Sequence, residues 1–216
     1  MIEADVQVIV PAKRLAEAKS RLRPVLGDAD REALVLDMLG RVIAAARGAR
    51  RVAFVAVVTS DARIGRLAQA RGARTLTDPG HDLNSSLSMA MQDPQIALGP
   101  ACLILPGDLP RLTADAVDGL LAWIEAPGRM VIAPDQHLAG TNALAWRGAS
   151  YDGFRFGPGS FIAHRDAGRA AGFTVVAQPV RPEFFDLDDI DGLARIEGFP
   201  RLVPRTSRVR EAKAHA

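Results

Sequence analysis

Short apolar runs alternate along this chain with longer stretches in which apolar residues recur at helical spacing. The apolar runs predict strands over 6–10, 52–58, 74–77, 101–105, 130–133, 143–146 and 173–177. The helical spacing predicts helices over 30–46, 61–71, 84–91, 113–124 and 160–171, with a last helix that begins near residue 188. Fully apolar strands that alternate with helices are typical of a parallel sheet covered on both faces. We therefore predict an α/β fold with a mostly parallel sheet.

Polar side chains stand where three of these helices begin, and we expect them to cap the helices. Asp28 or Asp30 is expected to cap the helix at 30–46. Thr113 is expected to cap the helix at 113–124, and Ser160 the helix at 160–171. Such caps satisfy backbone N–H groups that have no partner within the helix.

Length and charge indicate one compact domain and a basic end. A chain of 216 residues that is 48% hydrophobic can bury one substantial core, so we predict a single domain over 1–200. From Arg201 onward there are five Lys or Arg and one Glu, which leaves 22 basic and 24 acidic residues before it. The excess of basic residues thus lies in a tail over 201–216. We interpret this tail first as a solvated terminus, and the alternative is that it contacts a phosphate or a partner.

Composition also bears on partners and on the cellular compartment. Aromatic residues make up only 5% of the chain, which disfavours a protein that stacks bases along a nucleic acid. We see no signal peptide and no apolar run of the roughly 18 residues that a membrane span needs. A lone Cys102 in an apolar run cannot form an internal disulfide. We expect a cytoplasmic protein that binds neither nucleic acid nor membrane, and a homodimer remains open.

A basic segment follows the first predicted strand. The residues PAKRLAEAKSRL carry Lys13, Arg14, Lys19 and Arg21 against one acidic residue. In a sheet of this kind ligands bind beyond the carboxyl ends of the strands, and a nucleotide triphosphate needs such cations. The segment lacks the P-loop and GxGxxG patterns. A solvated basic loop is the alternative.

Two acidic segments provide candidate ligands for Mg²⁺. Asp108 lies between Pro106 and Pro110 directly after the predicted strand at 101–105, where the prolines restrict the backbone. Asp186 and Asp188 alternate around a leucine, so both would face one side of an extended segment. The alternatives are a turn cap for Asp108 and a helix cap for Asp188 or its neighbour Asp189.

The last candidate site spans residues 140–160. Thr141 begins a predicted strand, and Gly157 and Gly159 stand directly before Ser160 at the start of a predicted helix. Exposed amides at a helix start, together with a hydroxyl, form an anion site. A plain helix-entry turn is the alternative. The histidines are scattered and show no zinc-ligand spacing, so neither zinc nor covalent catalysis is expected.

The chain resembles a known enzyme family in five segments that occur in the same order: VPAKRLAEAKSRL, LPGDLPRLT, APDQHLAGTNAL, FRFGPGS and DLDDIDGL. The family is that of the 2-phospholactate guanylyltransferases of deazaflavin coenzyme (F-420) biosynthesis, with its phosphoenolpyruvate-using bacterial branch. The match runs from about Val8 to Leu193. The resemblance implies a Rossmann-like nucleotidyltransferase sheet similar to that of the molybdenum-cofactor guanylyltransferases.

The resemblance also implies roles for individual residues. The positions that hold the phosphorylated acid fall on Thr141, Gly157 and Ser160. The nucleotide contacts fall on Lys13, Lys19, Arg21 and Asn84, and the catalytic pair on Lys19 and Asp108. Asp108 and Asp188 would hold Mg²⁺.

The implied reaction transfers GMP from GTP to a three-carbon phosphorylated acid and releases pyrophosphate. The acid would be 2-phospholactate, phosphoenolpyruvate or 3-phosphoglycerate, and the residues alone do not distinguish them. Two alternatives stay open: a nucleotidyltransferase for a sugar phosphate or molybdopterin, and a non-catalytic nucleotide-binding module. The first would usually carry a GGxSxRMG-like loop, which this chain lacks.

Overall fold

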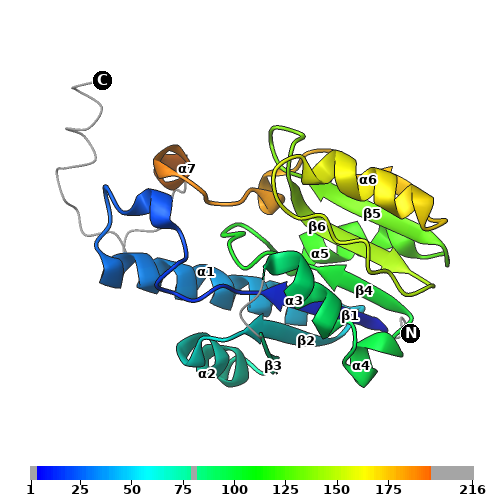
Figure 1. Cartoon of the computed structure of the whole chain (residues 1–216), viewed down its shortest axis with the longest axis horizontal. Coiled ribbons are helices and arrows are strands. Elements are labelled where there is room, and N and C mark those ends of the chain that lie inside the picture. Colours follow the sequence, from blue (N-terminus) through cyan, green and yellow to red (C-terminus); the bar gives the residue numbers. More distant parts are fainter. Residues whose placement is uncertain (1–3, 79–81, 196–216) are drawn as a thin grey trace.

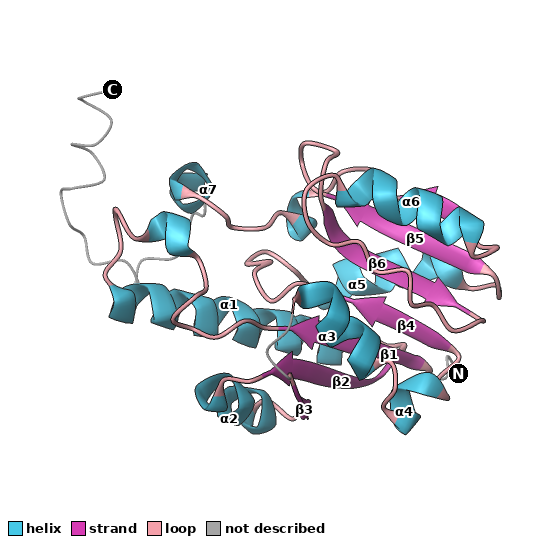
Figure 2. Ribbon diagram, in the orientation of Figure 1, coloured by secondary structure: helices cyan, strands magenta, loops and turns pink. Residues whose placement is uncertain are grey.

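The computed structural model describes residues 4–78 and 82–195, and within these ranges the chain forms one seven-stranded sheet in the order β3-β2-β1-β4-β6-β5-β7 (Figures 1 and 2). Its strands are β1 (Val6–Pro11), β2 (Val52–Thr59), β3 (Arg74–Thr77), β4 (Ala101–Ile104), β5 (Arg129–Pro134), β6 (Thr141–Arg147) and β7 (Thr174–Ala177). All seven predicted strands are therefore present. β6 runs antiparallel to both of its neighbours, and the other pairs are parallel.

Helices cover both faces of the sheet, because successive residues of each strand point to opposite sides. The helices are α1 (Asp28–Gly48), α2 (Ala62–Ala70), α3 (Leu83–Ala90), α4 (Pro94–Ala97), α5 (Ala114–Leu121), α6 (Ser160–Ala170) and α7 (Ile190–Arg195). Short 3₁₀ turns occur at η1 (Ser20–Leu22), η2 (Ala122–Ile124) and η3 (Pro182–Phe184). The mostly parallel α/β fold predicted from the sequence is confirmed.

Two hydrophobic cores lie on the two faces, and β1 contributes to both. Val8 and Val10 face the core shared with α1, α2 and α5, whereas Ile9 faces the core shared with α3 and α4. Figure 1 shows α6 lying over β5 and β6 on the side of α3, with α5 on the far side. Because helices cover both faces of the sheet, the loops that follow the parallel strands lie at the edge where these strands end.

The reversal of β6 determines which of its residues reach that edge. In the antiparallel pair Ile104 of β4 lies opposite Leu144, and Ala101 lies opposite Arg147. The start of β6 therefore lies at the carboxyl end of β4, and Thr141 reaches the edge where the loops after β1 and β4 emerge. None of the helices in the described ranges is long and apolar enough to cross a bilayer.

Several sequence-based details need correction. The residue before α1 is Gly27, with no side-chain cap, and Asp28 and Asp30 lie inside the first turn. Ser160 is likewise the first helical residue of α6, and the cap position belongs to Gly159. Thr113 does cap α5, as predicted. The short helix α4 was not predicted, and the basic tail at 201–216 lies outside the described residues.

Candidate active site

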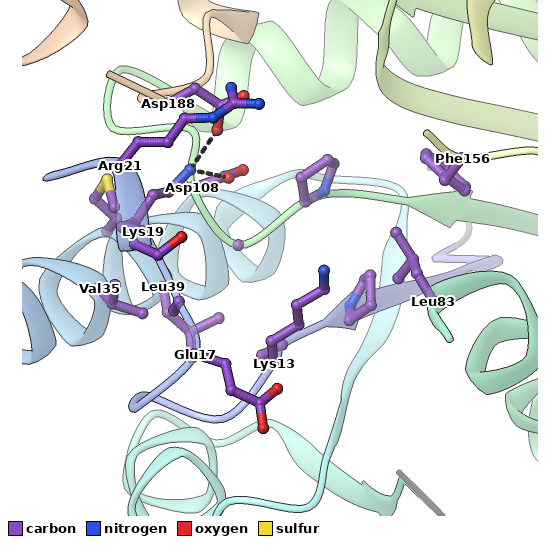
Figure 3. A pocket seen from close by; sticks show the side chains of 17 residues that line it. Lys13, Glu17, Lys19, Arg21, Val35, Leu39, Leu83, Asp108, Phe156 and Asp188 are labelled. Carbon is purple, nitrogen blue, oxygen red and sulfur yellow. Dashed lines mark hydrogen bonds and ion pairs between the residues drawn. The ribbon is translucent and has the colours of Figure 1, made fainter. Parts of the chain in front are cut away.

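A cavity of about 420 Å³ opens at the carboxyl edge of the sheet (Figure 3). The segment after β1 and the loop after β4 form most of its polar wall, and α1 contributes apolar side chains. Lys13, Lys19, Arg21, Asp108 and Asp188 all line it. The fold thus brings together five of the predicted nucleotide and metal residues, which are up to 175 positions apart in the sequence.

Lys19 lies between two carboxylates at the end of this cavity. Its Nζ donates to Asp108 Oδ2 at 2.5 Å and to Asp188 Oδ1 at 2.8 Å (Figure 3). Burial alone would lower the pKa of the Lys19 ammonium, but the two carboxylates outweigh it and raise the pKa above its usual value. Lys19 is therefore a fixed positive charge at neutral pH.

A third carboxylate, that of Asp186, stands beside this pair. Asn142 Nδ2 donates to Asp186 Oδ1 at 3.1 Å. Burial and the charges of Asp108 and Asp188 raise the pKa of Asp186 to about 6. Burial would raise the pKa of Asp188 as well, but the Lys19 ammonium holds it below the usual range. Three acidic side chains and one lysine thus share a small, partly dehydrated volume.

Backbone contacts fix where these carboxylates stand. Leu187 N donates to Asp108 O at 3.1 Å, which joins the late acidic segment to the loop after β4. Leu187 is buried, so Asp186 and Asp188 on either side of it face the other way, as the alternation predicted. Asp189 Oδ1 accepts from Gly192 N at 2.7 Å at the start of α7, so Asp189, and not Asp188, takes the capping role.

A buried arginine positions the loop that carries Lys19. Arg31 in α1 is 1% exposed, and its guanidinium donates to Leu15 O at 2.8 Å, to Ala18 O and to Asp28 Oδ1 at 2.9 Å. Lys19 itself has a left-handed backbone, with φ of 51°. Sequence reasoning missed Arg31, because nothing in its neighbourhood distinguishes it from an exposed helical arginine.

Lys13 and Arg21 complete the basic side of the cavity. Figure 3 shows the Lys13 amine extending into the cavity and the Arg21 guanidinium beside Asp188. Both side chains can therefore meet a polyanion that enters the cavity. The solvated-loop alternative fits them less well than a shared role in binding a charged ligand.

Asn84 has a different environment from the one the resemblance suggests. Phe156 N donates to Asn84 Oδ1 at 2.7 Å, and Asn84 Nδ2 donates to Phe156 O at 3.2 Å. This pair of bonds joins α3 to the segment before α6, and Leu83 and Phe156 both line the cavity. The structure thus gives Asn84 a structural role, and its contact with a base stays a prediction.

Thr141, Gly157 and Ser160 come from two elements whose starting points are tied together. Phe161 N donates to Ala139 O at 3.1 Å, which holds the beginning of α6 against the turn before β6. Gly157 has φ of 129°, a conformation that side chains rarely adopt, and no atom lies within 4 Å of where its Cβ would stand. These three residues do not line the 420 Å³ cavity itself, but Gly157 directly follows Phe156, which does line it.

A buried histidine that sequence reasoning set aside contacts this group. Thr141 Oγ1 and His164 Nδ1 are 2.9 Å apart, and Arg155 N donates to His164 Nε2 at 2.8 Å. Burial and the charge of Arg155 lower the pKa of His164 to about 4, so the ring is neutral. His164 lies four residues after Ser160, so both residues face one side of the helix. This spacing is the signal in the sequence that could have pointed to His164.

Comparison with known proteins places this arrangement in a family. Residues 6–193 match the family model described as "Guanylyl transferase CofC like". The chain belongs to this family. It is a nucleotidyltransferase, and the resemblance to this guanylyltransferase family that its motifs suggested is confirmed.

Curated relatives span nearly the whole chain. A phosphoenolpyruvate guanylyltransferase of Sphaerobacter thermophilus is 36% identical over 190 residues, covering 88% of this chain and 91% of its own. Another phosphoenolpyruvate guanylyltransferase, of Chloroflexus aggregans, is 40% identical over 191 residues, covering 86% of this chain and 94% of its own. Both matches cover most of this chain and most of the relative.

Solved structures support the fold. A Desulfovibrio desulfuricans protein assigned to the nucleotide-diphospho-sugar transferases matches with a TM-score of 0.72 at 19% identity, over 97% of this chain and 95% of its own. A nucleotidyl transferase from Methanothermobacter matches with a TM-score of 0.61 at 19% identity, over 88% and 95%. At these identities the likeness concerns the fold alone.

Proposed function

We propose that this guanylyltransferase moves GMP from GTP to phosphoenolpyruvate and releases pyrophosphate. The observation that carries the proposal is the Lys19 ammonium held between Asp108 and Asp188, at the wall of a cavity lined by two further cations. The family's curated relatives are named for phosphoenolpyruvate. The related acids 2-phospholactate and 3-phosphoglycerate are the competing acceptors, and coenzyme F-420 biosynthesis is the corresponding pathway.

The reaction needs positioning and charge neutralisation more than proton transfer. A phosphate monoester has its second pKa near 6, so at neutral pH the acceptor is largely a dianion. One of its phosphate oxygens forms a bond to the α-phosphorus of GTP, while the bond from that phosphorus to pyrophosphate breaks. No base is needed to take a proton, which suits a site built from Lys, Arg and Asp.

Each group of residues has a role in this scheme. Lys13, Lys19 and Arg21 would bind the triphosphate and stabilise the negative charge that develops on the leaving pyrophosphate. Thr141, Ser160 and the amide of Gly157 would hold the acid, so that its phosphate points towards the nucleotide. Fixing both substrates side by side at the edge of the sheet would remove much of the entropic barrier to their reaction.

The carboxylates also fit a divalent cation. Carboxylate oxygens are the ligands that Mg²⁺ prefers, and the buried Asp108 Oδ1 has no hydrogen-bond partner among the described residues. Asp108 and Asp188 would hold the ion. When bound, Mg²⁺ would neutralise charge on the phosphates that meet at the site.

A substrate panel tests the proposal. Purified protein is incubated with Mg²⁺, with one of four nucleotides and with one acceptor, which is one of the three acids, a sugar phosphate or molybdopterin, and pyrophosphate release is measured together with the mass of the product. We expect turnover with GTP and phosphoenolpyruvate. Absence of pyrophosphate in every combination would reject the proposal, and turnover with a sugar phosphate or molybdopterin instead would support the alternative function.

The variant Asp108→Asn tests the metal assignment. It is expected to fold like the wild type, because the amide keeps the size of the side chain, and to lose two or more powers of ten in kcat, corresponding to a few kcal/mol of charge stabilisation. Asp115→Asn, on the exposed side of α5, is the matched control and should keep full activity. Near-normal turnover of Asp108→Asn would remove Asp108 from the site.

A further inference from the structure

His164 is fully buried and contacts three different parts of the acid-binding region. Its Nδ1 faces the hydroxyl of Thr141 at the start of β6, and its Nε2 faces the backbone N–H of Arg155. Its ring also meets the Phe156 ring edge to face, with centroids 4.5 Å apart. One side chain thus connects the strand, the glycine segment and the helix that together surround the proposed acid site.

The hydrogen bonds fix where the ring proton lies. A backbone N–H can only donate, so the bond from Arg155 requires a lone pair on His164 Nε2. A charged ring, or a ring with its proton on Nε2, would set two N–H groups against each other. The ring is therefore neutral with its proton on Nδ1, and this proton is donated to Thr141 Oγ1.

This tautomer controls what the Thr141 hydroxyl can do. Because Oγ1 accepts from His164, its own hydrogen is not used in that bond and can be donated elsewhere. With the opposite tautomer the hydroxyl would donate to His164 and would present only lone pairs to a ligand. An anionic oxygen would then be repelled at the same position.

We propose that His164 is a positioning residue that fixes Thr141 as a hydrogen-bond donor to an unprotonated oxygen of the acid substrate. The inference rests on the proposed function, in which Thr141 contacts that acid. It adds that recognition of the substrate's negative charge at this position depends on a neutral, buried imidazole that does not itself touch the substrate. A charge-assisted hydrogen bond of this kind changes affinity by about 10- to 100-fold.

Two substitutions separate the two hydrogen bonds of His164. Asn places an amide nitrogen near the position of Nδ1, so His164→Asn can still donate to Thr141 but loses the contact with Arg155. Gln reaches the position of Nε2, so His164→Gln can accept from Arg155 but loses the donor to Thr141. Asn is one methylene shorter than Gln and leaves more empty space at this buried position. Lost packing alone would therefore make His164→Asn the more damaging variant, which is the opposite of the order that the proposal predicts.

Steady-state kinetics of these variants tests the proposal. In His164→Asn the KM for the acid should stay within about threefold of the wild type, whereas in His164→Gln it should rise about 10- to 100-fold, with the KM for GTP little changed in both. Thr141→Val should show the same rise, and adding it to His164→Gln should cost little more, because both remove one interaction. Equal KM values in the Asn and Gln variants would overturn the proposal.

A spectroscopic measurement tests the tautomer without enzyme activity. The ¹⁵N chemical shifts of the His164 ring distinguish a protonated nitrogen from an unprotonated one, and we expect the proton on Nδ1. A proton on Nε2 would overturn the inference. Should the wild type turn over no acid, the proposed function fails separately, and calorimetric binding of phosphoenolpyruvate to the same variants then decides the role of His164.

Discussion

Replacing Lys19 by Met should destabilise the protein in the absence of divalent cations. The side chain of Lys19 is 9% exposed, whereas those of its partners Asp108 and Asp188 are 27% and 53% exposed. Removing one partner from a fully buried ion pair costs about 3–5 kcal/mol, and a fully exposed pair contributes at most about 1 kcal/mol. Because water reaches both carboxylates here, we expect an intermediate loss of about 2 kcal/mol.

This loss corresponds to a fall in Tm of about 4–8 °C for a chain of this size. Thermal unfolding at pH 7.5 and low salt, with a chelator present, measures it. Lys13→Met is the matched control, because Lys13 lines the same cavity but is exposed and makes no ion pair among the described residues. Its Tm should change by less than about 2 °C, since exposed substitutions have small effects.

Adding Mg²⁺ should partly reverse the effect of Lys19→Met. Lysine and a divalent cation compete for the same carboxylates, so the variant should bind the ion at least as tightly as the wild type. An ion at 100 times its Kd stabilises the folded state by about 2.7 kcal/mol. The reasoning is refuted if Lys19→Met unfolds at the wild-type temperature in chelator, or if Mg²⁺ raises its Tm less than it raises that of the wild type.

Three further predictions concern the surroundings of this site. Arg31→Met should lower kcat/KM at least about tenfold, because the loop that bears Lys19 loses two hydrogen bonds, and steady-state kinetics measures it. Affinity for Mn²⁺ should fall as the pH drops below about 6, because Asp186 beside the proposed ligands then loses its negative charge, and calorimetry should find a weaker dependence of this affinity on pH in Asp186→Asn. Gly159→Ala, at φ of 72°, should lower the free energy of unfolding by about 1 kcal/mol, whereas denaturant unfolding of Gly65→Ala in α2 should show no loss.

The sequence predicted the sheet and most helices because their apolar positions repeat at regular spacing, which depends only on local neighbours. It also indicated the segments that meet at the sheet edge, since each follows or begins a predicted strand. The caps at Gly27 and Gly159 were missed because polar residues stood one position away. Such shifts of one residue depend on backbone angles that composition does not reveal.

The contacts of the site were less accessible to sequence reasoning. That Asp108 and Asp188 meet was predicted, but the insertion of Lys19 between them depends on a left-handed backbone and on the buried Arg31. His164 was set aside because the histidines are scattered and show no zinc-ligand spacing. Its partner, Thr141, is 23 residues away, and only the packing of α6 on β6 brings them together.

The direction of β6 gives the proposed nucleotide site and the proposed acid site different structural supports. The nucleotide end is built on loops that leave parallel strands, whereas the acid end is built on a strand that enters the sheet from the same edge. Lengthening the turn at 135–140 would therefore reshape the pocket for the acceptor without disturbing strand register elsewhere. In the proposed scheme, a change confined to this hairpin would alter the acceptor site while the nucleotide site keeps its form.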